Sequence, residues 1–272
     1  MRLLFLGDVV GRSGREAVIR CVPELREQLA LDMVVVNAEN AAAGFGITIK
    51  IADEFLAAGV DCLTTGNHVW DQKELVNTID RQPRLLRPLN YPDGTPGNGS
   101  ALVPLRDGRS VLVVCLIARM FMDPMDDPFR AVDRLVGQHT LGAGGTDAIF
   151  IDFHGEATSE KMAMGHFLDG RVSAVVGSHS HIPTADTWIL PGGTAYQTDA
   201  GMCGDYNSVI GVRKELSVSR FLKRIPTERM SPAEGEATVC GTFIETDDQT
   251  GLATRVEPVR LGGRLSRSLP TV

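Results

Sequence analysis

Six short apolar runs recur through most of the chain, and in each run the apolar residues are consecutive rather than alternating with polar ones. The runs occupy residues 3–6, 33–36, 62–63, 111–117, 148–151 and 174–176. Consecutive apolar residues over so few positions are typical of β-strands that are covered on both faces. Helix signals lie between the runs, and strands that alternate with helices predict an α/β layered fold.

The helix signals are residues that favour the first turn of a helix. They are two capping pairs, Ser13 with Glu16 and Asp71 with Glu74, and an N-cap residue followed by proline, Asp127 with Pro128. After the first pair, apolar residues at 18, 22, 25 and 29 keep helical spacing. Pro23 lies inside that helix and is expected to kink or split it, because proline lacks the N–H group that the helix interior needs.

Two regions depart from this alternation. Residues 90–99 are rich in glycine, proline and asparagine and predict a loop. From about residue 216 the helix signals fade, and apolar segments at 239–244 and 253–256 flank a turn sequence at 247–251, which predicts an antiparallel hairpin. The chain contains no internal repeat and no low-complexity linker, so residues 1–272 are expected to form a single domain that ends in a loose tail.

The composition excludes several classes of protein. A formal net charge of −7 argues against a surface that wraps duplex DNA. The apolar runs are far shorter than the roughly 20 residues of a membrane-spanning helix, so no membrane partner is expected. Five cysteines are odd in number and form no CxxC pair, which indicates free thiols and a cytoplasmic location. Cys203, which lies between glycines at 201 and 204, is expected to be the most exposed of them.

Polar side chains that can bind metal ions follow five of the apolar runs, just beyond the point where each predicted strand ends. These residues are Asp8, Glu39, Asn40, Asn67, His68, His154, His179 and His181. In an open α/β sheet, binding sites form at the edge where the strands have their carboxyl ends. His179 and His181 are two residues apart, so on an extended segment their imidazoles point the same way.

Each of these residues alone has a purely structural explanation. An aspartate after a strand is most often a helix N-cap, and a single buried histidine is more often a core residue than a ligand. Five such groups at one sheet edge are harder to explain by chance, and together they predict a metal site. Carboxylate, amide and imidazole ligands without a thiolate suit Mn, Fe or Zn. The donors are too many for one tetrahedral ion, and they fit two ions about 3.5–4 Å apart that share a bridging carboxylate.

Three motifs resemble the calcineurin-like metallophosphoesterases in kind and in order: Gly-Asp at 7–8, Gly-Asn-His at 66–68 and Gly-Ser-His-Ser-His at 177–181. Further segments resemble one branch of that superfamily, the YmdB-like bacterial phosphodiesterases. They are Gly-Asp-Val-Val-Gly at 7–11, Asn-Ala-Glu-Asn-Ala at 37–41, Gly-Asn-His-x-Trp-Asp at 66–71, Asp-Pro-Phe at 127–129, Ile-Asp-Phe-His-x-Glu-Ala-Thr-Ser-Glu-Lys at 151–161 and Asp-Asp-Gln-Thr at 247–250. The resemblance spans nearly the whole chain. It implies a calcineurin-like metallophosphoesterase sandwich, in which two β-sheets are flanked by helices.

The resemblance also implies a role for each candidate residue. One metal ion would be held by Asp8, Glu39, Asn40 and His181, and the other by Glu39, Asn67, His154 and His179. Glu39 would bridge the two ions, and His68 would be the proton donor. The wider superfamily usually has Asp-x-His in its first motif and an aspartate as the bridge. This chain has Asp8-Val-Val and Glu39 instead, as the YmdB-like branch does.

The implied reaction is hydrolysis of a phosphodiester by a hydroxide that bridges two metal ions. The implied substrates are cyclic nucleotides, with 2′,3′-cyclic nucleotides first and short RNA as a second class. The implied cofactors are two divalent or trivalent ions per chain, with Fe or Mn ahead of Zn, and a homo-oligomer is compatible with the sequence. The alternative is a regulatory metal-dependent module that binds a nucleotide or a partner and has incidental activity. An intact His68 favours the enzyme, because a pure binding site needs no proton donor.

The sequence does not identify the residues that contact the nucleotide base. Three aromatic residues, Tyr91, Phe121 and Tyr206, lie in predicted loops and are the candidates for an aromatic clamp.

Overall fold

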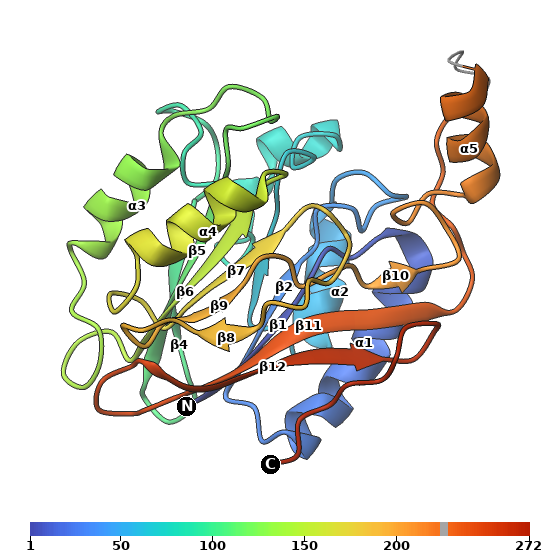
Figure 1. Cartoon of the computed structure of the whole chain (residues 1–272). Helices are drawn as coiled ribbons and strands as arrows, with labels where there is room; N and C mark the ends of the chain where they lie inside the picture. Colours follow the sequence, from blue (N-terminus) through green and yellow to red (C-terminus); the bar gives the residue numbers. More distant parts are fainter. Residues whose placement is uncertain (224–227) are drawn as a thin grey trace.

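The computed structural model describes residues 1–223 and 228–272 of the chain (Figure 1). The helices are α1 (Gly11–Gln28), α2 (Ile49–Ala57), the 3-10 helices η1 (Lys73–Asn77) and η2 (Ile79–Arg81), α3 (Pro128–Val136), α4 (Thr158–Phe167) and α5 (Lys214–Lys223). The strands are β1 (Arg2–Leu6), β2 (Met33–Asn37), β3 (Cys62–Thr64), β4 (Ser100–Pro104), β5 (Ser110–Ile117), β6 (Ala148–His154), β7 (Ala174–Ser178), β8 (Trp188–Ile189), β9 (Ala195–Gln197), β10 (Gly204–Asp205), β11 (Ala237–Thr246) and β12 (Ala253–Leu261).

Within the described residues the strands form two six-stranded sheets. The first sheet has the order β10-β11-β1-β2-β3, with β12 on the other side of β11, and its strands β1, β2 and β3 are parallel. The second sheet has the order β4-β5-β6-β7-β9-β8, with β5, β6, β7 and β9 parallel. The six apolar runs lie in β1, β2, β3, β5, β6 and β7, so the strand predictions are confirmed.

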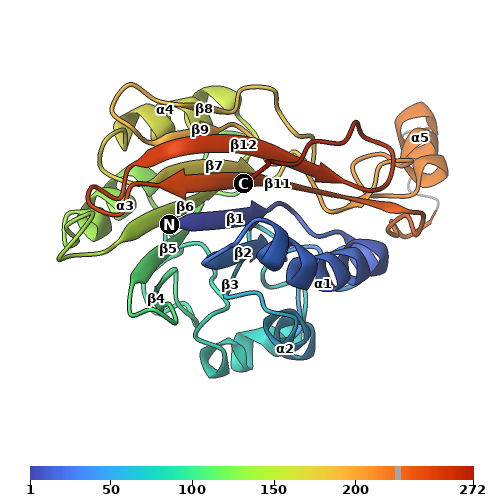
Figure 2. The same cartoon turned by 90° about the horizontal axis from the view of Figure 1, so that it is seen from below.

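The two sheets pack face to face between two layers of helices (Figure 2). Alternate side chains of each strand enter different cores. In β1, Leu4 and Leu6 belong to the core beneath α1 and α2, whereas Leu3 and Phe5 belong to the core between the sheets. The ring of Phe5 lies 5.1 Å from the ring of Phe150, centroid to centroid, across the sheets. Because both faces of the strands are covered, both must be apolar. The predicted α/β sandwich of two sheets flanked by helices is confirmed.

Three further sequence predictions are confirmed. The carboxylate of Asp127 accepts a hydrogen bond from the N–H group of Phe129 and caps α3. Residues 90–99 form a loop that precedes β4. The hairpin of β11 and β12 is antiparallel, and the carboxylate of Asp247 accepts hydrogen bonds from the N–H groups of its turn, including that of Thr250.

Two of the capping predictions are wrong, because the side chains of Ser13 and Asp71 bind other partners. Helix α1 begins before Ser13, whose hydroxyl donates to the carbonyl of Ala233 instead. Pro23 lies within α1 without splitting it, since α1 is one continuous helix. Asp71 caps no helix, because its carboxylate binds the ring of His68.

The expectation for Cys203 is also wrong. All five cysteines are free thiols, but Cys203 is fully buried because its segment pairs with Val9, and its thiol donates to the carbonyl of Cys240. Near the carboxyl end, where the sequence predicts a loose tail, Ser268 exchanges backbone hydrogen bonds with Arg260 of β12. In the described part of the chain, no helix combines the length and apolarity needed to cross a bilayer.

Candidate metal centre

The predicted site residues lie at one edge of the sandwich, where the carboxyl ends of strands from both sheets meet. Asp8 and Glu39 follow β1 and β2 of the first sheet by two residues each. His154 is the last residue of β6, and His179 comes directly after β7 in the second sheet. The side chains of Asp8, Glu39 and His154 are at most 1% exposed. The fold therefore buries carboxylates and imidazoles together at this edge of the sandwich.

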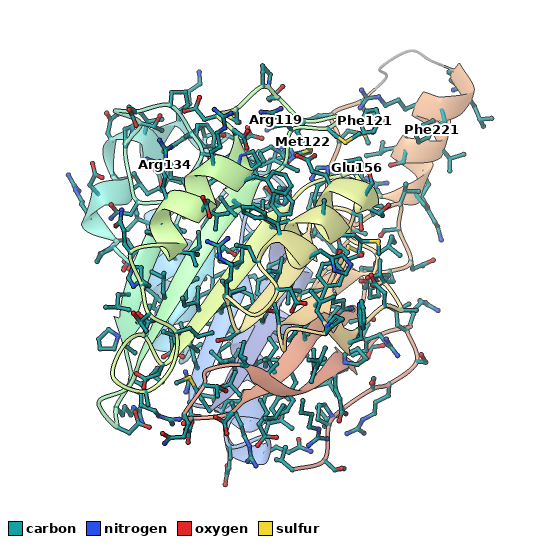
Figure 3. All side chains as sticks on the ribbon, turned by 60° about the vertical axis from the view of Figure 1, so that its left-hand side comes forward. Arg119, Phe121, Met122, Arg134, Glu156 and Phe221 are labelled. Carbon is teal, nitrogen blue, oxygen red and sulfur yellow. The ribbon has the colours of Figure 1, made fainter. Side chains whose placement is uncertain are left out.

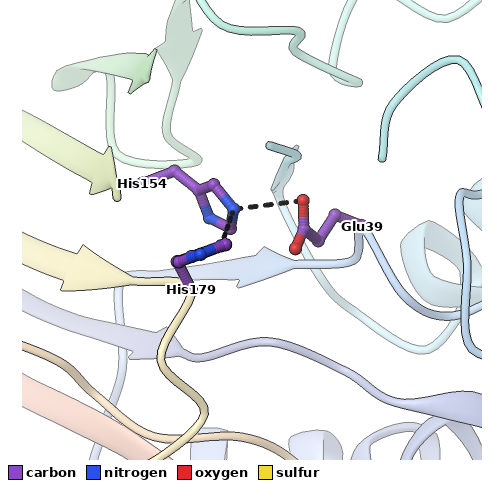
Figure 4. Close-up of side chains that lie close together, drawn as sticks. All are labelled: Glu39, His154 and His179. Atoms are coloured by element: carbon purple, nitrogen blue, oxygen red, sulfur yellow. Dashed lines mark hydrogen bonds and ion pairs between the residues drawn. The ribbon is translucent and has the colours of Figure 1, made fainter. Parts of the chain in front are cut away.

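His154 has three polar neighbours around a single ring nitrogen, and Figure 4 shows two of them, Glu39 and His179. Its Nε2 lies 3.2 Å from Oε2 of Glu39, 3.1 Å from Nδ1 of His179 and 3.0 Å from Oδ1 of Asn67. A ring nitrogen carries at most one proton, so one N–H group cannot serve all three neighbours. A cation placed among these four atoms would accept a lone pair from each of them.

A second group of ligand atoms shares Glu39 with the first. Asp8, Glu39 and His181 each offer one atom, and these atoms lie within 4.8 Å of one another. His181 donates from Nδ1 to the carbonyl of Ile210 at 2.7 Å, which leaves its Nε2 free for the site. Among the residues that the structure describes, the buried Oδ1 of Asn40 has no hydrogen-bond partner. A buried acceptor without a partner costs about 1–3 kcal/mol, and coordination to a cation would remove that cost.

The seven predicted ligand residues therefore converge on this edge, and the two groups divide as the resemblance implies. Carboxylate, amide and imidazole atoms in these numbers fit a pair of borderline metal ions joined by Glu39. Their role as ligands stays a prediction.

Burial and mutual charge set the ionisation of the metal-free cluster. Burial raises the pKa of Asp8 to about 6. Burial also acts to raise the pKa of Glu39, but the charge of His154 outweighs it and the pKa falls to about 2. Burial acts to lower the pKa of His154, yet the charge of Glu39 raises it to about 9. Burial and the neighbouring His154 lower the pKa of His179 to about 3. Without metal, the proton is therefore held between Glu39 and His154, at the place where an ion would bind.

A buried relay orients the ring of His154. The carboxylate of Asp152 accepts hydrogen bonds from Ser178 Oγ at 2.6 Å, Asn37 Nδ2 at 3.0 Å and Thr64 Oγ1 at 2.5 Å. Since the one hydroxyl proton of Ser178 goes to Asp152, its oxygen must accept the Nδ1–H of His154, at 2.9 Å. Nε2 is then the ring nitrogen that faces Glu39, His179 and Asn67. The relay also ties the two sheets together, because Asn37 and Thr64 belong to the first sheet and Asp152 to the second.

The loop that carries His179 and His181 has a strained backbone. Their φ angles are +100° and +66°, values that non-glycine residues adopt rarely and that concentrate at functional sites. Asp199 holds the loop by accepting the N–H of Ser180 at 2.9 Å. The buried Nζ of Lys161 bridges Asp199 Oδ2 at 2.9 Å and the carbonyl that precedes His179 at 2.7 Å. These contacts fix the two imidazoles before any ligand binds.

His68 lies beside the cluster but faces solvent, with 29% of its side chain exposed. Its Nδ1 is bound to Oδ2 of Asp71 at 2.8 Å, so Nε2 is the nitrogen left for a substrate. Its ring packs edge-on against Phe45, with 5.2 Å between the ring centroids. His68 therefore differs from the buried histidines in burial and in the direction of its free nitrogen.

The cluster opens into a cavity of about 280 Å³, which we call the metal cavity. Its polar side is formed by Glu39, Asn40, His68, Glu156, His179, Ser180 and His181. Its apolar side is formed by Val10, Phe45, Ile210, Val212 and Pro232. A cavity lined by charged groups and by apolar side chains suits a phosphate ester with an organic substituent.

A family model of YmdB-like proteins matches residues 4–259 of this chain. The chain belongs to the YmdB-like family. Its sequence is 47% identical to the 2′,3′-cyclic-nucleotide 2′-phosphodiesterase of Bacillus subtilis over 95% of this chain and 96% of that protein. The family resemblance stated from the motifs is thereby confirmed.

Solved structures of similar proteins share the YmdB-like fold. A hypothetical protein from Thermus thermophilus superposes with a TM-score of 0.89 at 42% identity, over 97% of this chain and 100% of that one. A novel phosphatase from Mycoplasma pneumoniae superposes with a TM-score of 0.88 at 33% identity, over 96% of this chain and 93% of that one. The match to this phosphatase confirms the calcineurin-like fold.

Sequence reasoning missed the residues that support the YmdB-like site. Asp152 could have been found, since an acid inside a buried apolar run needs hydrogen-bond partners. Asn37, Ser178 and Asp199 have no comparable signal, because their partners lie on strands distant in sequence. Of the three candidate aromatic residues, only Phe121 is strongly exposed, at 84%. Tyr91 packs against Trp70, and the hydroxyl of Tyr206 binds the carbonyl of His181.

Proposed function

We propose that this chain is a metal-dependent phosphodiesterase that opens 2′,3′-cyclic nucleotides, with His68 as its proton donor. The observation that carries the proposal is the position of His68 beside two ligand groups that share Glu39. The substrate class follows from the relative in Bacillus subtilis that is 47% identical and is a 2′,3′-cyclic-nucleotide 2′-phosphodiesterase.

The residues at this edge of the sandwich fit a pair of metal ions. Two observations indicate this: the buried Oδ1 of Asn40 has no hydrogen-bond partner among the described residues, and Nε2 of His154 has more polar neighbours than one proton can serve. Asp8, Asn40 and His181 would hold one ion, Asn67, His154 and His179 the other, and Glu39 both. Fe or Mn is proposed ahead of Zn, because the set has many oxygen donors and no thiolate. Bound ions would supply an activated water and neutralise the charge that develops on the phosphate.

The chain's own residues position the substrate and move the proton. The Nδ1 contact with Asp71 fixes the His68 ring, which lines the metal cavity, so Nε2 is the nitrogen left to meet the leaving oxygen. Protonation of the 2′-oxygen by Nε2 makes that oxygen a better leaving group. The phosphate would remain on the 3′-oxygen, in agreement with the 2′-phosphodiesterase named for the relative.

The proposal also includes the expectations from the sequence for domain organisation, location and partners. They are a single domain over residues 1–272, a cytoplasmic location, small cyclic nucleotides as the main partner with short RNA second, and no duplex DNA or membrane partner. The regulatory binding module is not favoured, because the Bacillus subtilis relative is a phosphodiesterase and its sequence matches this chain over nearly its whole length.

The test is a product analysis. Purified protein loaded with Mn or Fe should convert 2′,3′-cyclic AMP to 3′-AMP, and 3′,5′-cyclic AMP serves as the comparison substrate. Phosphorus NMR distinguishes the 3′- from the 2′-monophosphate. Metal-loaded protein that binds the cyclic nucleotide without converting it would refute the enzyme and support the binding module.

A further inference from the structure

A second cavity adjoins the metal cavity and shares part of its wall. It has a volume of about 600 Å³ and lies between residues 209–212 and helix α5. Ile210 and Val212 line both cavities. Helix α5 stands apart from the two sheets at the same end of the molecule as the site (Figure 1), and Phe221 lies on it (Figure 3). We call this space the α5 cavity.

The wall between the cavities is built into the metal site. The carbonyl of Ile210 accepts the Nδ1–H of His181 at 2.7 Å, so the segment and a predicted ligand hold one another in place. Ile210 has a φ of +46°, which is a real outlier for a β-branched residue. Val212 is paired with Val209 and with Pro232, which fixes the segment on its other side. Strain held by a hydrogen bond to a site residue indicates a functional position.

The metal cavity alone has little room for a whole nucleotide. Sites for drug-sized ligands usually enclose about 300–1,000 Å³. The metal cavity has about 280 Å³, part of which the ions and the phosphate would fill. The α5 cavity adjoins it at Ile210 and Val212, which line both cavities, and offers about twice that volume. A substituent on the phosphate that follows the apolar wall would enter it.

The side chains from α5 suit a nucleobase. Arg220 and Phe221 line the α5 cavity next to each other, and Phe221 is 79% exposed. Arg220 brings a guanidinium to this cavity and Phe221 brings an aromatic ring. Aromatic rings and guanidinium planes are the groups on which proteins stack unpaired bases.

We propose that the α5 cavity binds the nucleoside part of the substrate, with the base stacked on Arg220 or Phe221 and the phosphate held at the metal cavity. This inference rests on the proposed function and extends it by assigning the residues that recognise the base. Arg220 and Phe221 act on binding, because neither lines the metal cavity.

The experiment compares Arg220→Ala and Phe221→Ala with Leu222→Ala. Leu222 is the matched control, since it lies on the same helix and is also 79% exposed but does not line the cavity. Each variant is assayed with 2′,3′-cyclic AMP and with methyl p-nitrophenyl phosphate, a diester that has no base. Loss of the side chain on which the base stacks should raise KM for the cyclic nucleotide about 5- to 100-fold, with kcat nearly unchanged. The base-free diester should be hydrolysed as by the wild type.

Equal effects on both substrates, or unchanged KM for the cyclic nucleotide in both variants, would overturn the assignment. A changed oligomeric mass of the two variants in analytical ultracentrifugation would also overturn it and assign this face to subunit contact. If the wild type hydrolyses neither substrate, the proposed function is wrong, and AMP binding by calorimetry decides the inference. Weaker AMP binding by Arg220→Ala than by Leu222→Ala supports it, and equal or absent binding refutes it.

Discussion

Replacing Ser178 by alanine tests how the chain orients a metal-binding histidine. In the native relay Ser178 donates to Asp152 and accepts from Nδ1 of His154, at 2.6 and 2.9 Å. The substitution removes these two hydrogen bonds and a weaker one that Ser178 Oγ accepts from Asn37 Nδ2 at 3.2 Å. The ring N–H of His154 is then left buried without this partner. His154 is then free to rotate, or to change tautomer and carry its proton on Nε2, where the ion would bind.

The expected losses can be bounded from these contacts. A buried donor left unpaired costs about 1–3 kcal/mol of folding stability. Asp152 keeps two of its hydrogen bonds, from Asn37 and Thr64, so its carboxylate adds little to that cost. Loss of the hydrogen bond that orients a ligand typically weakens metal binding about 10- to 100-fold. Each tenfold loss corresponds to about 1.4 kcal/mol. The variant should therefore fold and bind metal weakly.

Ser173→Ala is the matched control. Ser173 is also buried, precedes the same strand at its opposite end, and binds the N–H of Ile149 at 3.0 Å and the carbonyl of Gly251 at 2.6 Å. Both variants should lose similar stability in urea denaturation, but only Ser178→Ala should lose affinity for Mn in a chelator competition. Equal metal affinities of the two variants would refute the role of the relay and question His154 as a ligand.

Three further predictions concern the same site. His68→Ala should keep the metals and lose about 10²- to 10⁴-fold in kcat with 2′,3′-cyclic AMP, but less with a nitrophenyl diester, whose leaving group needs no proton; equal losses would contradict the proton-donor role. Gly66→Ala places a methyl carbon 2.3 Å from Glu39 Oε2 and His154 Nε2, so metal affinity should fall at least tenfold, which Mn titration measures. Gly204→Ala, whose added carbon meets only contacts of 3.4 Å or more, should bind metal normally. Burial acts to lower the pKa of His154, but the charge of Glu39 raises it to about 9. At pH 8 a metal ion that binds His154 therefore displaces a proton from its ring. Affinity should therefore fall as the pH is lowered below 9, and calorimetric heats that do not vary with the ionisation enthalpy of the buffer would contradict this.

Local patterns in the sequence predicted the strands and the edge at which the site lies. The apolar runs needed no tertiary information, because a strand covered on both faces must be apolar throughout. The position of Asp8, Glu39, His154 and His179 after these strands then followed from the rule that parallel strands end at one edge. The capping pair at Ser13 failed for the opposite reason, because Ser13 bonds to the distant Ala233, whereas Asp71 failed through a local contact with His68.

The supporting residues could not be predicted in the same way. The relay from Asp152 to His154 joins β2, β3, β6 and β7. No local sequence pattern predicts which strands of the two sheets lie next to each other. The wall at Ile210 is likewise unexpected, since a β-branched residue normally avoids a positive φ. Such features exist because the surrounding fold imposes them.

The central claim is that one carboxylate, Glu39, joins two metal ions at this edge. Metal analysis by mass spectrometry of the purified protein and of Glu39→Ala tests it most directly. The native chain should contain close to two ions, and the variant should lose both while remaining folded by circular dichroism. Full metal content in folded Glu39→Ala would contradict the shared centre on which the proposed chemistry depends.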